Sequence, residues 1–501
     1  MRIMPENNRK KTLINFLSGL VSQIIVLVLG LVVPRIILMN YGSDTNGVIS
    51  TTTQIFTFMA LLEAGISASS RNALYKPIKA NDKQGISYWL SASRRYYRKI
   101  SVIYFVAVVI LALSIPLVIK TSVSYWTIFF YVIFEGLTSV VSFFFINTWT
   151  CFLGANGKQY IVTWIGVLTK ILCYTVRIVL SLKNIDIAYI QIGYFLVSLV
   201  QLLIYYIFMK KKYGWIDYNA VPKDVELPDR NAYIVTEIAW TIFSSTDMII
   251  LSMFISTKLS SVYYVYNMVF VALNGLLNAA YAAINYNLGH AYVTDIEKYK
   301  KVHSFYHSFF LAAMTVLMCV AYIMIIPFVK LYTAGVTDAE YIYKPLPLLF
   351  CLVQLLSWSR YVAGNLSGIA GYAKQTSNVS LIEALINITI SVILVNYLGI
   401  VGVLIATVIA LPLKVVYLNW LAERKVMKRS PKKTIMTLIV NYLIFGATVV
   451  LNEYITISVN SYAYFFIYAG CLFILYLIIT FMLNALVNKD LLKLTRFLKR
   501  G

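Results

Sequence analysis

Two acidic residues lie inside an apolar stretch that is long enough to cross a lipid bilayer. The stretch runs from Tyr233 to Ser256 and contains Glu237 and Asp247. A membrane-spanning helix needs about 20 residues, and a carboxylate at its centre costs roughly 2.5–3.5 kcal/mol. We therefore expect both acids to face an internal cavity. There they would bind a coupling cation, Na⁺ or H⁺, or neutralise nearby basic side chains.

Five basic residues also lie in apolar stretches; Lys414 is close enough to the cytoplasmic surface to snorkel, and the other four form the second group that could do chemistry. They are Arg35, Lys170, Arg177 and Arg360. Lys170 and Arg177 are seven residues apart, so they share one face of a helix. A cation near the end of a span can snorkel to the surface, but Lys170 lies at mid-span. These residues predict a cationic lumen that binds an anionic group, with pairing to the intramembrane acids as the alternative.

A stripe of amides follows in the second half of the chain. Its asparagines fall within about 60° of one another on a helix and flank Tyr281; they are Asn267, Asn274, Asn278 and Asn285. Carboxamides both donate and accept hydrogen bonds, which suits sugar hydroxyls. The stripe predicts a sugar-contact surface. The alternative is hydrogen bonding between neighbouring helices.

The composition indicates the architecture that must position these side chains. The chain has 501 residues, of which 60% are hydrophobic and 13% charged, whereas soluble proteins contain about 25% charged residues. The apolar residues form runs near 20 residues long, which is typical of membrane-spanning helices and not of β-barrel strands. We predict an all-α polytopic membrane protein with about fourteen transmembrane helices. The expected spans are 12–39, 47–70, 100–119, 124–152, 160–182, 187–209, 233–256, 260–286, 305–329, 345–367, 376–397, 400–421, 435–453 and 462–487.

The net charge of +23 reports topology and does not indicate nucleic-acid binding. With the basic N-terminus in the cytoplasm, the whole excess of Lys and Arg falls in the loops on that side. This is the distribution that the positive-inside rule describes. We therefore expect both termini to be cytoplasmic, with contacts to anionic lipid headgroups and none to nucleic acid.

The chain also carries signs of an internal duplication. Lys158-Gln159 and Lys374-Gln375 lie in two cytoplasmic loops and are offset by 216 residues. The expected first helices of the two halves are offset similarly. We predict two six-helix lobes in a parallel pseudo-twofold repeat, as in alternating-access transporters, plus two C-terminal helices. The expected boundaries are 1–209 for the N-terminal lobe, 210–232 for a cytoplasmic linker, 233–421 for the C-terminal lobe and 422–501 for the last two helices and a basic amphipathic tail.

The sequence gives little support for a catalytic site or a metal site. His303 and His307 have a spacing that can bind metal, but no third ligand accompanies them. The longest outer loop, near 330–344, contains Asp338 and Glu340 and no His. We predict no catalytic residues, no metal and no cofactor apart from the coupling ion.

Several motifs, taken in order along the whole chain, resemble the Wzx-type polysaccharide flippases of the multidrug/oligosaccharidyl-lipid/polysaccharide exporter superfamily. The motifs are Pro34-Arg35 before Tyr41-Gly42, Glu63-Ala-Gly65-Ile66, the two Lys-Gln loops, Ser245-Thr-Asp-Met-Ile-Ile-Leu-Ser252 followed by Val262-Tyr-Tyr264, and Gly399-Ile-Val-Gly402.

The resemblance implies a flippase of the bacterial cytoplasmic membrane. Such a protein moves an undecaprenyl-diphosphate-linked oligosaccharide from the cytoplasmic to the outer leaflet and can work with a polysaccharide polymerase. It also implies that arginines bind the diphosphate, a role that Arg35 and Arg360 match by location.

Three alternatives remain. A multidrug/cation antiporter of the same fold would have a lumen dominated by acids, whereas the first-half spans hold Arg35, Lys170 and Arg177 against Glu63 and Glu135. A lipid II flippase would also fit the resemblance. A polymerase or glycosyltransferase would need a catalytic constellation that the sequence does not contain.

Overall fold

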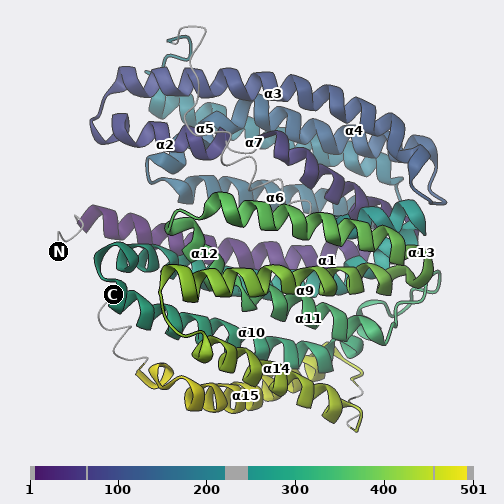
Figure 1. Ribbon diagram of the computed structural model, residues 1–501. Coiled ribbons are helices and arrows are strands. Elements are labelled where there is room, and N and C mark those ends of the chain that lie inside the picture. The colour runs from purple at the N-terminus through teal and green to yellow at the C-terminus, as the bar shows by residue number, and fades with distance from the viewer. Residues whose placement is uncertain (1–5, 64–65, 221–245, 455–456, 458, 494–501) are drawn as a thin grey trace. The chain divides into compact units, whose positions relative to one another are not determined.

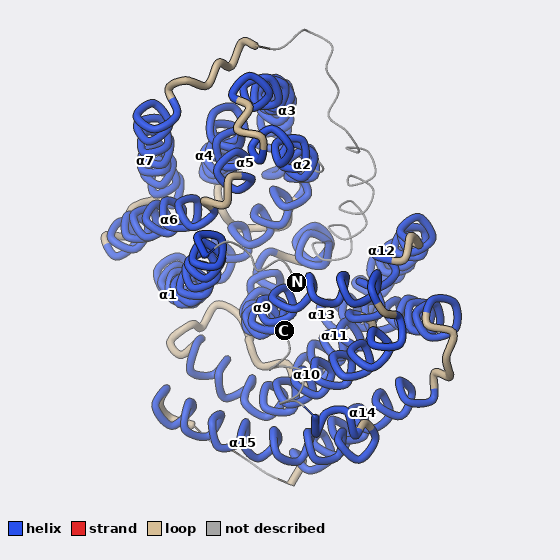
Figure 2. Tube along the Cα trace, turned by 90° about the vertical axis from the view of Figure 1, so that its left-hand side faces the viewer, coloured by secondary structure: helices blue, strands red, loops and turns tan. Residues whose placement is uncertain are grey.

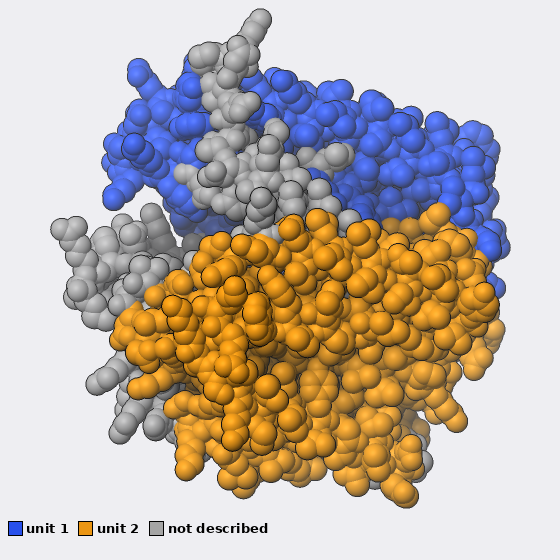
Figure 3. All heavy atoms as spheres, in the orientation of Figure 1, with its two compact units in different colours: residues 1–245, 256–258 blue, residues 246–255, 259–501 orange. Residues whose placement is uncertain are grey.

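The computed structural model describes residues 6–63, 66–220, 246–454, 457 and 459–493, and these residues form helices and loops without strands (Figure 1). Figure 2 traces the same residues by secondary structure. The chain divides into two compact units. Unit 1 comprises residues 1–245 and 256–258, and unit 2 comprises 246–255 and 259–501; they are blue and orange in Figure 3.

Unit 1 is built from seven labelled helices. A π-helical segment, Ser142–Ile146, joins α4 to α5, and a 3₁₀ turn, Ala60–Glu63, follows α1. The helices are α1 (Glu6–Met59), α2 (Ile66–Lys79), α3 (Lys83–Val118), α4 (Tyr125–Val141), α5 (Asn147–Ala155), α6 (Gln159–Leu182) and α7 (Ile187–Tyr213).

Unit 2 continues from a helix over 246–254. Within it, α10 packs against α11, α14 and α15 (Figure 1). Its labelled helices are α9 (Thr257–Thr294, which begins in unit 1), α10 (Ile296–Tyr332), α11 (Pro345–Ser359), α12 (Tyr361–Ile369), α13 (Ala373–Trp420), α14 (Lys432–Asn452) and α15 (Tyr462–Val487). A π-helical segment, Leu421–Val426, follows α13, and a 3₁₀ turn, Lys489–Lys493, follows α15.

The predicted all-α polytopic membrane class is confirmed. Among the described residues, eleven helical stretches are long and apolar enough to cross a membrane. Two of them are about twice the necessary length and contain a non-helical glycine, Gly42 in α1 and Gly399 in α13. Divided at these breaks, the stretches supply thirteen spans. The fourteenth expected span, 233–256, is described only from residue 246.

The same helix-ending turn occurs in both units, at the two Lys-Gln loops. Gly157 after α5 and Gly371 after α12 both adopt positive φ angles, 70° and 82°. In each turn the next residue donates its amide hydrogen to the carbonyl five positions back, Lys158 to Leu153 at 2.8 Å and Tyr372 to Ser367 at 2.9 Å. A left-handed glycine is what this helix end requires.

The helix preceding each of these turns is also interrupted. In unit 1 the π-helical segment Ser142–Ile146 separates α4 from α5, and in unit 2 Arg360 separates α11 from α12. Such irregularities leave backbone groups that neighbouring helices must satisfy, and they are frequent at functional sites. The break in unit 2, at Arg360, is therefore a place to look for a functional site.

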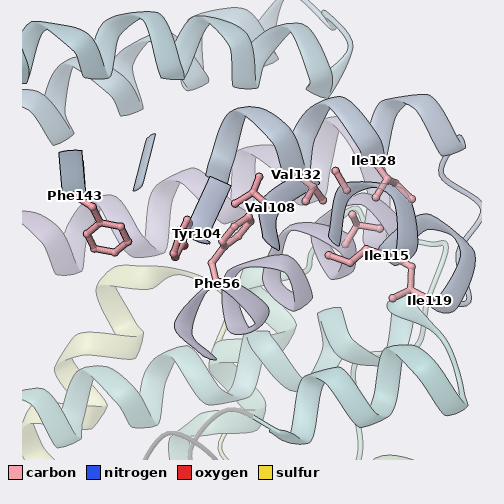
Figure 4. Close-up of a cluster of buried hydrophobic side chains, with 10 residues drawn as sticks. Phe56, Tyr104, Val108, Ile115, Ile119, Ile128, Val132 and Phe143 are labelled. Carbon is pink, nitrogen blue, oxygen red and sulfur yellow. The ribbon is translucent and has the colours of Figure 1, made fainter. Parts of the chain in front are cut away.

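Helices α3 and α4 form a tightly packed core in unit 1. Buried residues recur every three or four positions along α3, as a helix packed on one face requires, and they meet Phe56 of α1 and Phe143 (Figure 4). A β-carbon on Gly136 of α4 would overlap the Val108 side chain. This glycine lets the two helices approach closely, as small residues do in membrane bundles.

At one end of unit 1, α1 passes very close to the backbone of Thr257. The carboxylate of Asp44 accepts hydrogen bonds from the hydroxyls of Ser122 and Thr257, and the Thr257 amide donates to the Lys120 carbonyl at 3.0 Å. A β-carbon on Gly47 would overlap the Thr257 carbonyl. Because the obstacle is backbone, no rotamer change can relieve it.

We predict that Gly47→Ala lowers the stability of the purified protein, with a cost of about 1–3 kcal/mol from overpacking. The measurement is thermal unfolding in detergent. Gly166→Ala on α6 is the matched control, because a β-carbon there meets nothing within 4 Å. Its midpoint should be unchanged or slightly higher, since alanine favours helix. Equal midpoints for the two variants would contradict the close approach.

Candidate functional site

Arg360 lies in the break between α11 and α12, where the chain turns out of one helix and into the next. Its guanidinium is buried and lies 2.5 Å from a carboxylate oxygen of Glu383 on α13. The other oxygen of Glu383 lies 3.4 Å from Nζ of Lys414. Glu383 and Lys414 both belong to α13, but the break at Gly399 divides this helix into two spans. Glu383 precedes the break and Lys414 follows it. Three successive spans thus bring one charge each to the same point.

This cluster carries more positive than negative charge. Glu383 is almost fully enclosed, with 2% of its side chain exposed, whereas Lys414 retains 17%. Enclosing charges in a membrane is costly unless they are paired, and one carboxylate neutralises only one of two cations. Counted over the described residues that these contacts join, the cluster has a net charge of +1, and Lys414 keeps part of its side chain accessible. That arrangement can bind an anion.

The amide stripe on α9 lies in the same unit and partly contacts α11. The indole nitrogen of Trp358 donates to Oδ1 of Asn274 at 2.8 Å, and the Asn278 amide lies 3.4 Å from the same oxygen. Both asparagines are half-buried, as is Asn267. The side chain of Asn285 lies outside the described residues. One member of the stripe thus bonds a neighbouring helix, and sugar contact stays a prediction for the stripe.

Asp247 is the buried acid without a basic partner in the part of unit 2 that the structure describes. Its Oδ2 accepts a hydrogen bond from Tyr263 at 2.8 Å, and its Oδ1 has no hydrogen-bond partner there. A buried carboxylate with one neutral partner is stable only when it holds a proton or a cation. Asp247 therefore has the surroundings of a cation or proton site. Glu237 lies outside the described residues.

Arg177 of unit 1 is enclosed in a network of its own. Its guanidinium donates to Gln191 at 2.7 Å, and Gln191 donates to Glu135 at 2.6 Å. Glu135 itself lies 3.9 Å from Arg177, and the Tyr194 ring lies 4.5 Å from the guanidinium carbon. One acid thus balances one base, so this network is neutral overall, unlike the cluster around Glu383.

Lys170 and Arg177 are in different environments, although the sequence assigns them to one face of a helix. Lys170 has an exposed side chain and makes no ion pair with a described residue. Buried positions recur along α6 in steps of four, at Ile165, Thr169, Cys173, Arg177 and Ser181. Each such step overshoots a full turn by about 40°, so the buried stripe drifts around the helix and passes beside Lys170. Arg35 on α1 is half-buried.

The sequence reasoning left several residues of this region out of the site. Glu383 and Lys414 complete the cluster at Arg360, and Trp358 and Tyr361 flank it along the chain. The available signal was that three consecutive spans each carry one charge in the same half of the membrane. The aromatic pair carried no such signal, because aromatic residues are common throughout these spans.

His303 and His307 lie on α10 and are 1% and 2% exposed. Their rings are parallel, with centroids 6.2 Å apart, and Arg429 pairs with Glu423 beside them. Among the described residues, no group of three metal-ligating side chains is assembled, here or elsewhere.

Comparison with known proteins identifies the fold. The chain resembles a multidrug resistance MATE family transporter of the MOP superfamily in an inward-facing conformation (TM-score 0.63, 14% identity, covering 86% of this chain and 98% of that one). It also resembles the lipid II flippase MurJ in an inward closed conformation (TM-score 0.65, 13% identity, 96% and 100%). A third similar structure is the MATE multidrug transporter DinF-BH (TM-score 0.57, 19% identity, 85% and 97%).

No protein-family profile and no curated protein sequence matches the chain. The protein therefore has the fold of the MATE and MurJ transporters. At these low identities the likeness establishes the fold alone.

We predict that Glu383→Gln destabilises the protein strongly, because it removes the buried carboxylate that Arg360 and Lys414 share. Breaking a buried ion pair costs about 3–5 kcal/mol, which thermal unfolding in detergent would detect. The matched control is Glu297→Gln. Glu297 also pairs with a lysine, Lys300, but its side chain is 72% exposed, so its loss should leave the midpoint unchanged. Similar midpoints for both variants would contradict the buried cluster.

Proposed function

We propose that the protein is an alternating-access flippase that moves an undecaprenyl-diphosphate-linked oligosaccharide from the cytoplasmic to the outer leaflet of a bacterial membrane. The lipid II flippase MurJ shares the fold over 96% of the chain. The observation that carries the proposal is the convergence of two cations, Arg360 and Lys414, on the one carboxylate of Glu383 among the described residues.

A diphosphate suits this cluster chemically. Its oxygens accept charge-assisted hydrogen bonds from guanidinium and ammonium groups, which are roughly twice as strong as neutral ones. Lys414 has the accessible side chain, and Arg360 is already oriented by Glu383. On the topology expected from the positive-inside pattern, the cluster lies in the cytoplasmic half of the membrane. That is where a lipid loaded from the cytoplasmic leaflet would first meet it.

Arg35, Lys170 and Arg177 are less direct candidates for the same role. The charge of Arg177 is balanced by Glu135, so it offers no surplus to a ligand. Arg35 and Lys170 keep accessible surface in unit 1 and are further candidates for contact with the anionic substrate. The sugars would meet the amides of Asn267, Asn274, Asn278 and Asn285.

Asp247 is the site we propose for a coupling cation, H⁺ or Na⁺. The acids Glu135, Glu383 and Glu423 each have a basic partner within 4.0 Å, so a further cation would compete with that partner. Asp247 has Tyr263 alone among the described residues. Glu237, from the same predicted span, remains a second candidate.

A multidrug antiporter is the second candidate function, favoured by the MATE structures with the same fold and by the unpaired carboxylate of Asp247. It predicts export of cationic dyes. The flippase hypothesis instead predicts an anionic substrate, contacts with anionic lipids on the basic cytoplasmic face, and cooperation with a polysaccharide polymerase.

We predict that Lys414→Gln lowers glycan transport at least tenfold while the protein still folds. The variant leaves Arg360 and Glu383 as a neutral pair, so it removes the surplus charge and not the buried ion pair. Transport is measured as surface polysaccharide in a complemented deletion strain. Lys414→Arg, which keeps the charge, should restore it. Wild-type polysaccharide with folded Lys414→Gln would remove this residue from the mechanism.

We predict that Asp247→Asn separates transport from its ion gradient. Asparagine keeps the shape and still accepts the hydrogen bond from Tyr263, but it cannot take up a proton or hold a cation by charge. In proteoliposomes, an imposed H⁺ or Na⁺ gradient should accelerate wild-type transport and leave the variant unaffected. An undiminished response of the variant would exclude Asp247 as the coupling site.

The proposed function itself is tested by deleting the gene. Accumulation of undecaprenyl-linked glycan in the cytoplasmic leaflet, with loss of surface polysaccharide and rescue by the wild-type gene, is the expected outcome. Normal surface polysaccharide combined with increased sensitivity to cationic dyes would instead establish the antiporter.

A further inference from the structure

One carboxylate oxygen of Asp247 is enclosed and has no hydrogen bond among the described residues. This oxygen, Oδ1, exposes less than 1 Å² of surface, while Oδ2 accepts the hydrogen bond from Tyr263 at 2.8 Å. A water molecule in contact with Oδ1 would need far more surface than that, so there is no room for one beside it. An ion held at Oδ1 in this conformation therefore has no water ligand.

The surroundings of the Asp247–Tyr263 pair are aromatic and apolar. Tyr263 of α9 is 7% exposed, and the centroid of its ring lies 5.1 Å from that of Phe350 on α11. Phe350 in turn stacks on Tyr266 and Phe270, with centroids 6.0 and 5.1 Å apart. An ionised carboxylate is costly in such surroundings, whereas a protonated carboxyl is neutral and can be enclosed at a much smaller cost.

Two serine hydroxyls on the same pair of helices are directed to backbone carbonyls and not to Asp247. Ser260 donates to the carbonyl of Met248 at 3.0 Å, and Ser252 donates to the carbonyl of Ile249 at 2.9 Å. In the described part of the chain, no charged side chain forms an ion pair with Asp247. A metal cation without water needs several oxygen ligands in place of its hydration shell, whereas a proton needs a single oxygen.

From these contacts we infer that Asp247 takes up a proton and not a sodium ion, with Tyr263 as the positioning residue. The proton comes from water and binds Oδ1, because Oδ2 accepts the phenol hydrogen. Its return to water requires another conformation, which an alternating-access cycle provides. The inference rests on the proposed function for this exchange, and it adds which ion drives transport.

The test is infrared spectroscopy of the full-length protein in nanodiscs, which records the carbonyl band of a protonated carboxyl directly. The difference between the wild type and Asp247→Asn should contain this band at low pH and lose it at high pH. Replacing K⁺ by Na⁺ at constant ionic strength should leave the band unchanged. Tyr263→Phe removes the hydrogen bond to Oδ2, so the band should persist and shift to higher frequency.

A control variant and a transport measurement complete the test. Glu340→Gln is the matched control, because Glu340 is an exposed acid in the loop between α10 and α11. Its spectrum should retain the wild-type band, since the band belongs to an enclosed carboxyl. In proteoliposomes with wild-type protein, a pH gradient should accelerate glycan transport and a sodium gradient should not. This measurement decides the question if Asp247→Asn does not fold.

The outcomes separate the choice of ion from the proposed function. Loss of the band on addition of Na⁺, its absence at every pH, or acceleration of transport by a sodium gradient alone overturns the inference. An unshifted band in folded Tyr263→Phe overturns the role of Tyr263. A wild-type protein that shows the band but moves no lipid-linked glycan overturns the proposed function and leaves the proton site standing.

Discussion

A single buried carboxylate, Glu383, is shared by Arg360 and Lys414, and the charged cluster of unit 2 depends on this interaction. Enclosing a cation in a membrane helix is costly without a partner, and Glu383 supplies one to both Arg360 and Lys414. The break after α11 brings Arg360 to the carboxylate, and the break at Gly399 folds the second part of α13 back so that Lys414 reaches it as well. The interruptions at Arg360 and Gly399 thus bring the members of one ion cluster together.

The buried charges are balanced at Arg177 in unit 1 but not at Glu383 among the described residues of unit 2. In unit 1, Glu135 and Arg177 balance one another through Gln191, with tyrosines around them. In unit 2, the cluster at Glu383 has a surplus of positive charge, while Asp247 has no basic partner among the described residues. On the proposed function, unit 2 would bind both the anionic substrate, at Arg360 and Lys414, and the coupling cation, at Asp247.

Sequence patterns predicted the spans because about 20 apolar residues are a direct requirement of the bilayer. They also located the intramembrane charges, but not their partners. The pairing of Glu383 with two cations requires three helices to converge, and helical spacing within one segment carries no information about that. For the same reason, spacing grouped Lys170 with Arg177, although the drift of the buried stripe on α6 separates them. The stripe on α9 was recognised, yet the bond between Asn274 and Trp358 depends on packing against α11.

The most direct test of the account is the movement of a lipid-linked oligosaccharide by the purified protein. Proteoliposomes containing undecaprenyl-diphosphate oligosaccharide in the inner leaflet would be exposed to a lectin or glycosidase that acts only from outside. The account predicts that glycan becomes accessible in a protein-dependent manner and that inorganic diphosphate slows its appearance by competing at the cluster around Glu383. Accessibility equal to that of protein-free vesicles, in a preparation that exports cationic dyes, would contradict it.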